Sequence, residues 1–92
     1  METAYANRFR NILRRLTAPE NSEKYNAICT LPMTDDENRI WELCQKFWPE
    51  GSPGAHLNIE EYKVNDIYDD FTANRYLSEL ETLLDKHGWK KD

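Results

Sequence analysis

The sequence predicts a mainly α fold: one small domain, residues 1–92, built as a bundle of four or five helices. Apolar side chains recur at helical spacing in three separate segments, and proline or glycine follows each segment. A chain of 92 residues is long enough for one domain and too short for two. Aromatic residues make up 12% of the chain, too many for a disordered protein, so we expect a folded aromatic core.

The first predicted helix spans residues 2–17. Its apolar residues fall on one stripe at helical spacing: Tyr5, Phe9, Ile12, Leu13 and Leu16. Ala18 precedes Pro19, and a residue before proline avoids the helical conformation, so the helix is expected to end there.

Residues 22–31 fit two structures. They form either a short helix capped by Ser22, or a buried strand over 25–31, because the segment holds β-branched and aromatic residues. A strand here would pair with an extended piece near 55–60 and make the fold α+β. Periodicity cannot decide for so short a run, and Pro32 ends the segment in both cases.

The second predicted helix spans residues 35–48. Thr34 and Glu37 form a capping-box pattern at its start, and Pro49 ends it before a turn-rich loop over 49–54. The core stripe of this helix is Ile40, Leu43, Cys44 and Phe47, with Trp41 and Trp48 to one side.

The pattern of apolar residues changes within residues 55–71. We expect an extended piece near 56–60 and then a helix over 65–71, because Val64, Ile67, Tyr68 and Phe71 share one helical stripe. The alternative is one helix from Ile59, with Asn58 as its cap.

The third predicted long helix spans residues 73–87. Its stripe consists of Tyr76, Leu77, Leu80, Leu83 and Leu84. This stripe is out of phase with the one before Phe71, so we expect a break at Thr72, which would cap the new helix. Gly88 stands where a left-handed residue ends a helix, and Trp89 can then fold back onto the last turn.

Catalytic and metal-binding patterns are absent from the sequence. The possible sulfur and imidazole ligands are Cys29, Cys44, His56 and His87, and none forms a local pair of the kind that holds structural zinc. Adjacent carboxylates point in different directions, and three glycines cannot make a phosphate loop. We therefore expect a protein that is not an enzyme and has no metal and no cofactor.

The chain also lacks targeting signals. A transmembrane helix needs about 20 consecutive apolar residues, and the sequence has no such run. Its first residues hold no apolar stretch of the kind found in secretory signals, and two cysteines do not make a disulfide framework. We expect a cytoplasmic protein that does not enter the membrane.

Charge is distributed unevenly along the chain. Residues 1–19 carry a balance of +3, whereas the whole chain carries −5. The basic residues of the first helix are Arg8, Arg10, Arg14 and Arg15. They could contact phosphates or an acidic protein; the simpler interpretation is that they pair with the acidic part of the same chain. A basic second helix at helix-turn-helix spacing is missing, so duplex reading is not expected.

Aromatic and acidic side chains supply the other candidate contacts. A core this small cannot fully bury Trp41, Trp48 and Trp89 together, and exposed tryptophans are common in interfaces. The acidic candidates are Glu60, Glu61, Asp66, Asp69 and Asp70, either as a solvated face or as an imitation of a phosphate backbone.

These features favour a small non-catalytic protein that binds, and thereby inhibits or regulates, a larger protein or ribonucleoprotein. Small phage and mobile-element proteins that act against host systems share this general character. The alternative is a nucleic-acid-binding module that uses the arginines of the first helix.

Overall fold

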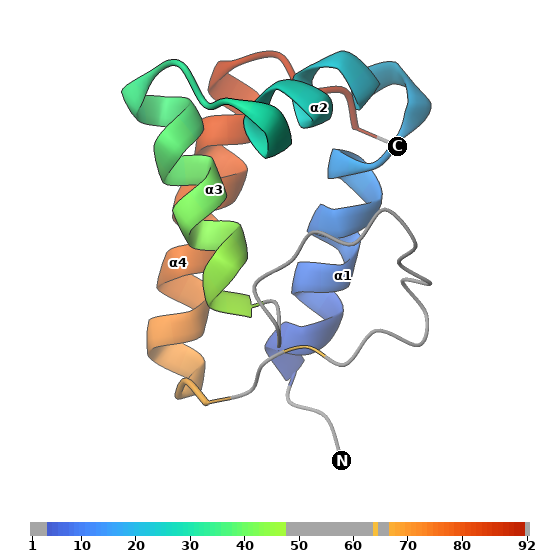
Figure 1. The fold of residues 1–92 in the computed structure, drawn as a ribbon. Coiled ribbons are helices and arrows are strands. Elements are labelled where there is room, and N and C mark those ends of the chain that lie inside the picture. The colour runs from blue at the N-terminus through green and yellow to red at the C-terminus, as the bar shows by residue number, and fades with distance from the viewer. Residues whose placement is uncertain (1–3, 48–63, 65–66, 92) are drawn as a thin grey trace.

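The computed structural model describes residues 4–47, 64 and 67–91, and within them it has four α-helices and no strand. The helices are α1 (Ala4–Leu16), α2 (Ser22–Thr30), α3 (Asp35–Phe47) and α4 (Asp70–Lys86), with a short 3-10 helix, η1 (Pro19–Asn21), before α2 (Figure 1). This confirms the mainly α fold. None of these described helices is long and apolar enough to cross a membrane.

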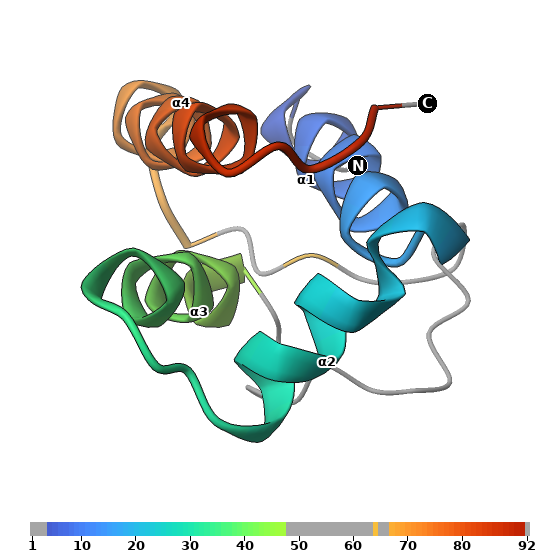
Figure 2. The same ribbon diagram turned by 90° about the horizontal axis from the view of Figure 1, so that it is seen from above.

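The helices form a bundle in which α4 packs against both α1 and α3. Helix α2 crosses one end of the bundle and packs against α3 (Figures 1 and 2). Helices α1 and α4 run in the same direction, because Arg8 contacts Ser78 while Arg15, further along α1, contacts Asp85. Helix α3 runs the opposite way between the two ends of the bundle (Figure 1).

The core is centred on Phe47, the last residue of α3. Its ring lies 5.1 Å from Phe9 and 5.9 Å from Tyr5, measured between centroids, and 5.6 Å from Tyr68. The predicted stripes of the first and second helices are all buried, as are Leu77, Leu80 and Leu84 of α4. The helical spacing of apolar residues therefore identified the core faces of these three helices correctly.

The strand alternative for residues 25–31 is wrong, because this segment belongs to α2. Ile28 is buried, and Tyr25, one turn earlier, packs against the core, so one helical face points inward. Ala27 and Leu31 are exposed, although an alternating strand that buried Tyr25 would bury them too. Ser22 is not the cap either, since the chain enters α2 directly from η1. The proposed partner strand at 55–60 lies outside the described residues.

The predicted helix over 65–71 with a break at Thr72 is also wrong in its described part. Residues 67–69 are not helical, and α4 begins at Asp70. The cap is Asp69, whose carboxylate accepts a hydrogen bond of 3.3 Å from the backbone N–H of Thr72. The supposed stripe is not buried as a unit, because Ile67 and Phe71 are 74% and 77% exposed. The extended piece near 56–60, the alternative helix from Ile59, and residues 65 and 66 lie outside the described residues.

Two helix ends form as expected. The backbone N–H of Glu37 donates to Oγ1 of Thr34 over 3.1 Å, which is the threonine half of the capping box. At the end of α4, Gly88 has a φ of +72°, and the N–H of Trp89 donates to the carbonyl of Leu84 over 3.0 Å. This left-handed ending turns the chain back, and Trp89 is only 5% exposed.

The segment after α4 is held by a partly buried hydrogen-bond network, here called the C-terminal anchor, made by Arg15, Asn21, Asp85, Trp89 and Lys90. Nδ2 of Asn21 donates to the carbonyls of Arg15 (2.7 Å) and Lys90 (3.0 Å), and its Oδ1 accepts from the N–H of Lys90 (2.8 Å). Nη2 of Arg15 donates to Oδ1 of Asp85 (2.8 Å) and to the carbonyl of Trp89 (2.7 Å). The anchor thus joins the end of α1, the start of α2 and the chain beyond α4.

Asn21→Ala should lower the free energy of unfolding by about 2 kcal/mol, because it removes the three hydrogen bonds that join Arg15 of α1 to Lys90. Urea denaturation checks this. Asn26→Ala, at an exposed position on α2, is the matched control and should change the value by less than about 0.5 kcal/mol. Equal effects of the two substitutions would contradict the role given to Asn21.

Candidate partner-binding surface

A groove of about 370 Å³ lies between α2, the start of α3 and the end of α4. Its floor is apolar and consists of Ile28, Ile40 and Trp89, which are 2%, 1% and 5% exposed. Ala27, in the last turns of α2, is exposed and forms part of its wall. Trp89 lies in the floor because the C-terminal anchor holds the chain there, so the groove depends on the anchor.

The rim of the groove carries charge from two helices. Glu23 and Lys24 line it from α2, and Glu37 lines it from the first turn of α3. Neither Glu23 nor Glu37 forms an ion pair with another residue in the described part of the chain. Their carboxylates are therefore available to a molecule in the groove.

The imidazole of His87, which also lines the groove, already has a partner within the protein. Its Nε2 lies 2.8 Å from Oδ2 of Asp36, and Nζ of Lys86 lies 2.9 Å from the same oxygen. Hydrogen bonds from Lys86 and then His87 hold the pKa of Asp36 below its usual range. This cluster ties the start of α3 to the end of α4 and closes one end of the groove.

An exposed apolar loop borders the groove between α2 and α3. It comprises Leu31, Pro32 and Met33, and the side chains of Leu31 and Met33 are 64% and 75% exposed. The loop leads directly into Thr34, which lines the groove. Large apolar side chains beside a groove are typical of contact surfaces.

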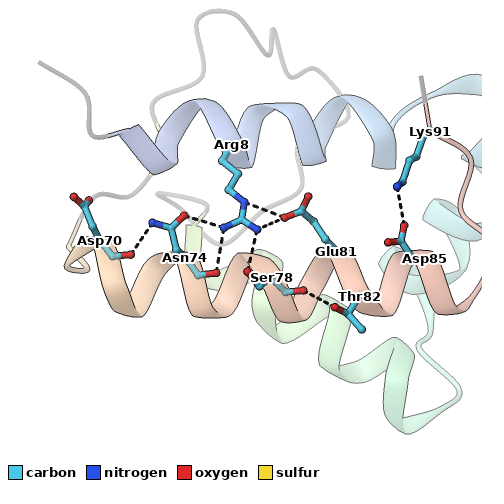
Figure 3. Close-up of polar contacts among 8 residues, drawn as sticks. All are labelled: Arg8, Asp70, Asn74, Ser78, Glu81, Thr82, Asp85 and Lys91. Atoms are coloured by element: carbon cyan, nitrogen blue, oxygen red, sulfur yellow. Dashed lines mark hydrogen bonds and ion pairs between the residues drawn. The ribbon is translucent and has the colours of Figure 1, made fainter.

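The arginines predicted as partner contacts are largely used inside the molecule. Arg8 reaches from α1 to α4, where it donates to Glu81 Oε1 (2.9 Å), Asn74 Oδ1 (2.8 Å) and Ser78 Oγ (3.0 Å) (Figure 3). Arg15 belongs to the C-terminal anchor. Pairing with the acidic part of the same chain, the simpler interpretation of the sequence, is therefore confirmed for these two residues.

The other two arginines make local contacts on α1. Arg10 is 5% exposed and donates to Oδ1 of Asn7 over 3.3 Å, and Arg14 donates to Oδ1 of Asn11 over 2.7 Å. A second hollow of about 320 Å³ lies beside Arg14 and Arg15, with Lys91 and Glu81 also in its lining. It carries more positive than negative charge, but three of its charged groups, Arg15, Glu81 and Lys91, already pair with neighbours.

The remaining candidates are dispersed. Trp41 is half-buried and packs against the core. Asp69 is the cap of α4, and its hydrogen bonds from Thr72 keep the pKa of Asp69 low, while Asp70 is the exposed first residue of that helix. The other four lie outside the described residues: Trp48, Glu60, Glu61 and Asp66. The structure therefore does not gather the acidic candidates into one described surface.

Both thiols lie in environments that disfavour the thiolate. Burial raises the pKa of Cys44, which is fully buried in the core, and the nearby Cys29 adds to the effect. Burial also raises the pKa of Cys29, partly offset by a hydrogen bond with Tyr25. In the described residues, no group of three or more His, Cys, Asp or Glu side chains could hold a metal ion. A nucleophilic cysteine needs a lowered pKa, the opposite of the shift at Cys29 and Cys44.

Comparison with protein-family models, with curated proteins and with solved structures finds no match to this chain. A function is therefore inferred from the geometry, charge and exposure of its own residues. Sequence reasoning missed the groove, although Leu31 and Met33 on either side of Pro32 were a signal: two large apolar residues in a predicted break between elements.

Proposed function

We propose that this protein is a non-catalytic binding protein that docks onto a larger protein or ribonucleoprotein and thereby inhibits or regulates it. The observation that carries the proposal is the apolar floor of the groove with Leu31 and Met33 exposed at its edge. Fully burying the exposed side chains of Leu31 and Met33 on binding stabilises a complex by about 1.5–3 kcal/mol each. A protein of 11.0 kDa has enough surface to bury the roughly 800 Å² per partner of an interface of standard size.

The groove suits a protein segment better than a small metabolite. Its apolar groups form the floor and its charged groups stand at the rim, which is the arrangement of protein interfaces. The raised pKa of each thiol supports a non-catalytic role, because neither cysteine is activated as a nucleophile.

Nucleic-acid binding is the second candidate, and the hollow beside Arg14, Arg15 and Lys91 is the observation that favours it. It ranks second because Arg15 is held by Asp85 and the Trp89 carbonyl, and Glu81 adds negative charge to the same lining. Phosphate contacts need several arginines or lysines free to pair with successive phosphates.

The double substitution Leu31→Glu with Met33→Glu should abolish capture of the partner in an affinity pull-down from the native host. Both side chains are exposed, so the fold should tolerate the change while two charges enter the contact surface. The measurement is the amount of each stoichiometric partner recovered with wild-type and variant protein.

The matched control is Ile67→Glu with Phe71→Glu, two equally exposed apolar side chains at the opposite end of α4. This control should capture the partner as the wild type does. Loss of capture by the control alone, or recovery of no stoichiometric partner by the wild type, would refute the proposed surface.

At physiological salt, the isolated protein should bind neither duplex nor single-stranded nucleic acid appreciably, because Arg8 and Arg15 are committed to α4 and its continuation. Fluorescence anisotropy with labelled oligonucleotides checks this. Micromolar binding that weakens steeply with salt and is lost in Arg14→Gln with Lys91→Gln would place the nucleic-acid function first.

A further inference from the structure

We infer that the occupant of the groove is a basic amphipathic segment of the partner: an apolar face seated on Ile28, Ile40 and Trp89, with lysine or arginine beside it. This inference rests on the proposed function and names the chemistry that the groove selects. The inference is drawn from the lining of the groove, which is apolar at the floor and charged at the rim.

The uncompensated charges around the groove are mainly negative. Glu23 and Glu37 line it, and Asp35 stands at the first position of α3, all without an ion pair to another described residue. Lys24 is the opposing cation on the rim, whereas Nε2 of His87 is bonded to Asp36. In the lining itself two carboxylates stand against one ammonium, which favours a positively charged occupant.

The helix ends at the groove leave this balance of side-chain charge in place. The carbonyl end of α4 reaches the lining at His87, and such an end carries a partial negative charge of about −0.5. The start of α3 contributes a partial positive charge of about +0.5, which the carboxylates of its own first turn exceed. Lys86 offsets the end of α4, so Glu23, Glu37 and Lys24 set the charge that an occupant meets.

The apolar part of the groove requires an occupant with apolar side chains as well as positive charge. Leu31 and Met33 are exposed in the loop that joins α2, which supplies Ile28 to the floor, to α3, which supplies Ile40; Figure 2 shows this loop beside the two helices. A helix with apolar residues at positions i, i+3, i+4 and i+7 presents a matching face. A basic tail without apolar residues would leave the floor uncovered.

Three fluorescein-labelled peptides test this. The first has leucine at i, i+3, i+4 and i+7 with lysine elsewhere, over about 14 residues, a length at which a helix can form on binding. The second replaces every lysine with glutamate, and the third keeps lysine but replaces every leucine with serine. Fluorescence anisotropy at physiological salt should show that the first binds the wild-type protein at least about tenfold more tightly than either other peptide.

Two pairs of variants locate the binding. Ala27→Trp fills the groove without changing its charge and should abolish binding of the leucine–lysine peptide, whereas Asn26→Trp, next to it on the exposed side of α2, should leave binding intact. Glu23→Gln with Glu37→Gln should weaken binding about tenfold. Gln at position 37 also suits a capping box, so α3 should persist. Glu42→Gln with Asp70→Asn removes two exposed carboxylates elsewhere and should have little effect.

The inference is overturned if the leucine–lysine peptide does not bind, if the leucine–glutamate peptide binds as tightly, or if Ala27→Trp binds like the wild type. The pull-down separates this failure from failure of the proposed function. A partner captured through Leu31 and Met33 while the peptides fail leaves the function standing with a different occupant. A partner captured equally by the Leu31→Glu, Met33→Glu variant and by Ala27→Trp removes both.

Discussion

The buried side chain of Asn21 connects three parts of the chain that no helix joins. It bonds one carbonyl of α1, that of Arg15, and both backbone groups of Lys90, while the Arg15 side chain holds the carbonyl of Trp89. A buried backbone group without a partner is costly, so this network fixes where the chain goes after α4. Helix α2, which buries only Ile28, is placed by the same contacts. The floor of the groove follows from that placement.

Ion pairs between the helices align α1 and α3 with α4. Arg8 and Arg15 lie about two turns apart on α1, so they share one face, and both reach α4. Arg39 joins α3 to α4 through two bonds to Glu79, of 2.6 and 2.9 Å, which lower the pKa of Glu79. These pairs are partly exposed, and each adds modest stability, but together they select one register of α4 against its neighbours. Glu23 and Glu37 at the groove are among the carboxylates that these pairs leave without a basic partner.

The sequence predicted the long elements well because each buries a continuous stripe, as Phe9 and Leu13 do in α1 and Leu77 and Leu80 in α4. It left α2 undecided because one buried Ile28 gives no period, and it misplaced the start of α4 because Asp69 caps through geometry that spacing does not reveal. That Arg8 and Arg15 pair with acidic residues of the same chain was foreseeable from the charge balance alone. The groove was not, because Ile28, Ile40 and Trp89 come from distant positions and meet only in the folded chain.

The most direct test of this account is amide hydrogen exchange at Lys90, measured by NMR on the wild-type protein. This residue lies beyond α4, where an amide outside a helix normally exchanges at the rate of an unfolded chain. Because its N–H donates to buried Asn21, the account predicts exchange slowed by at least about a hundredfold, approaching the protection of the core. Exchange at the unprotected rate would show that the chain beyond α4 is not held and that the groove lacks its floor.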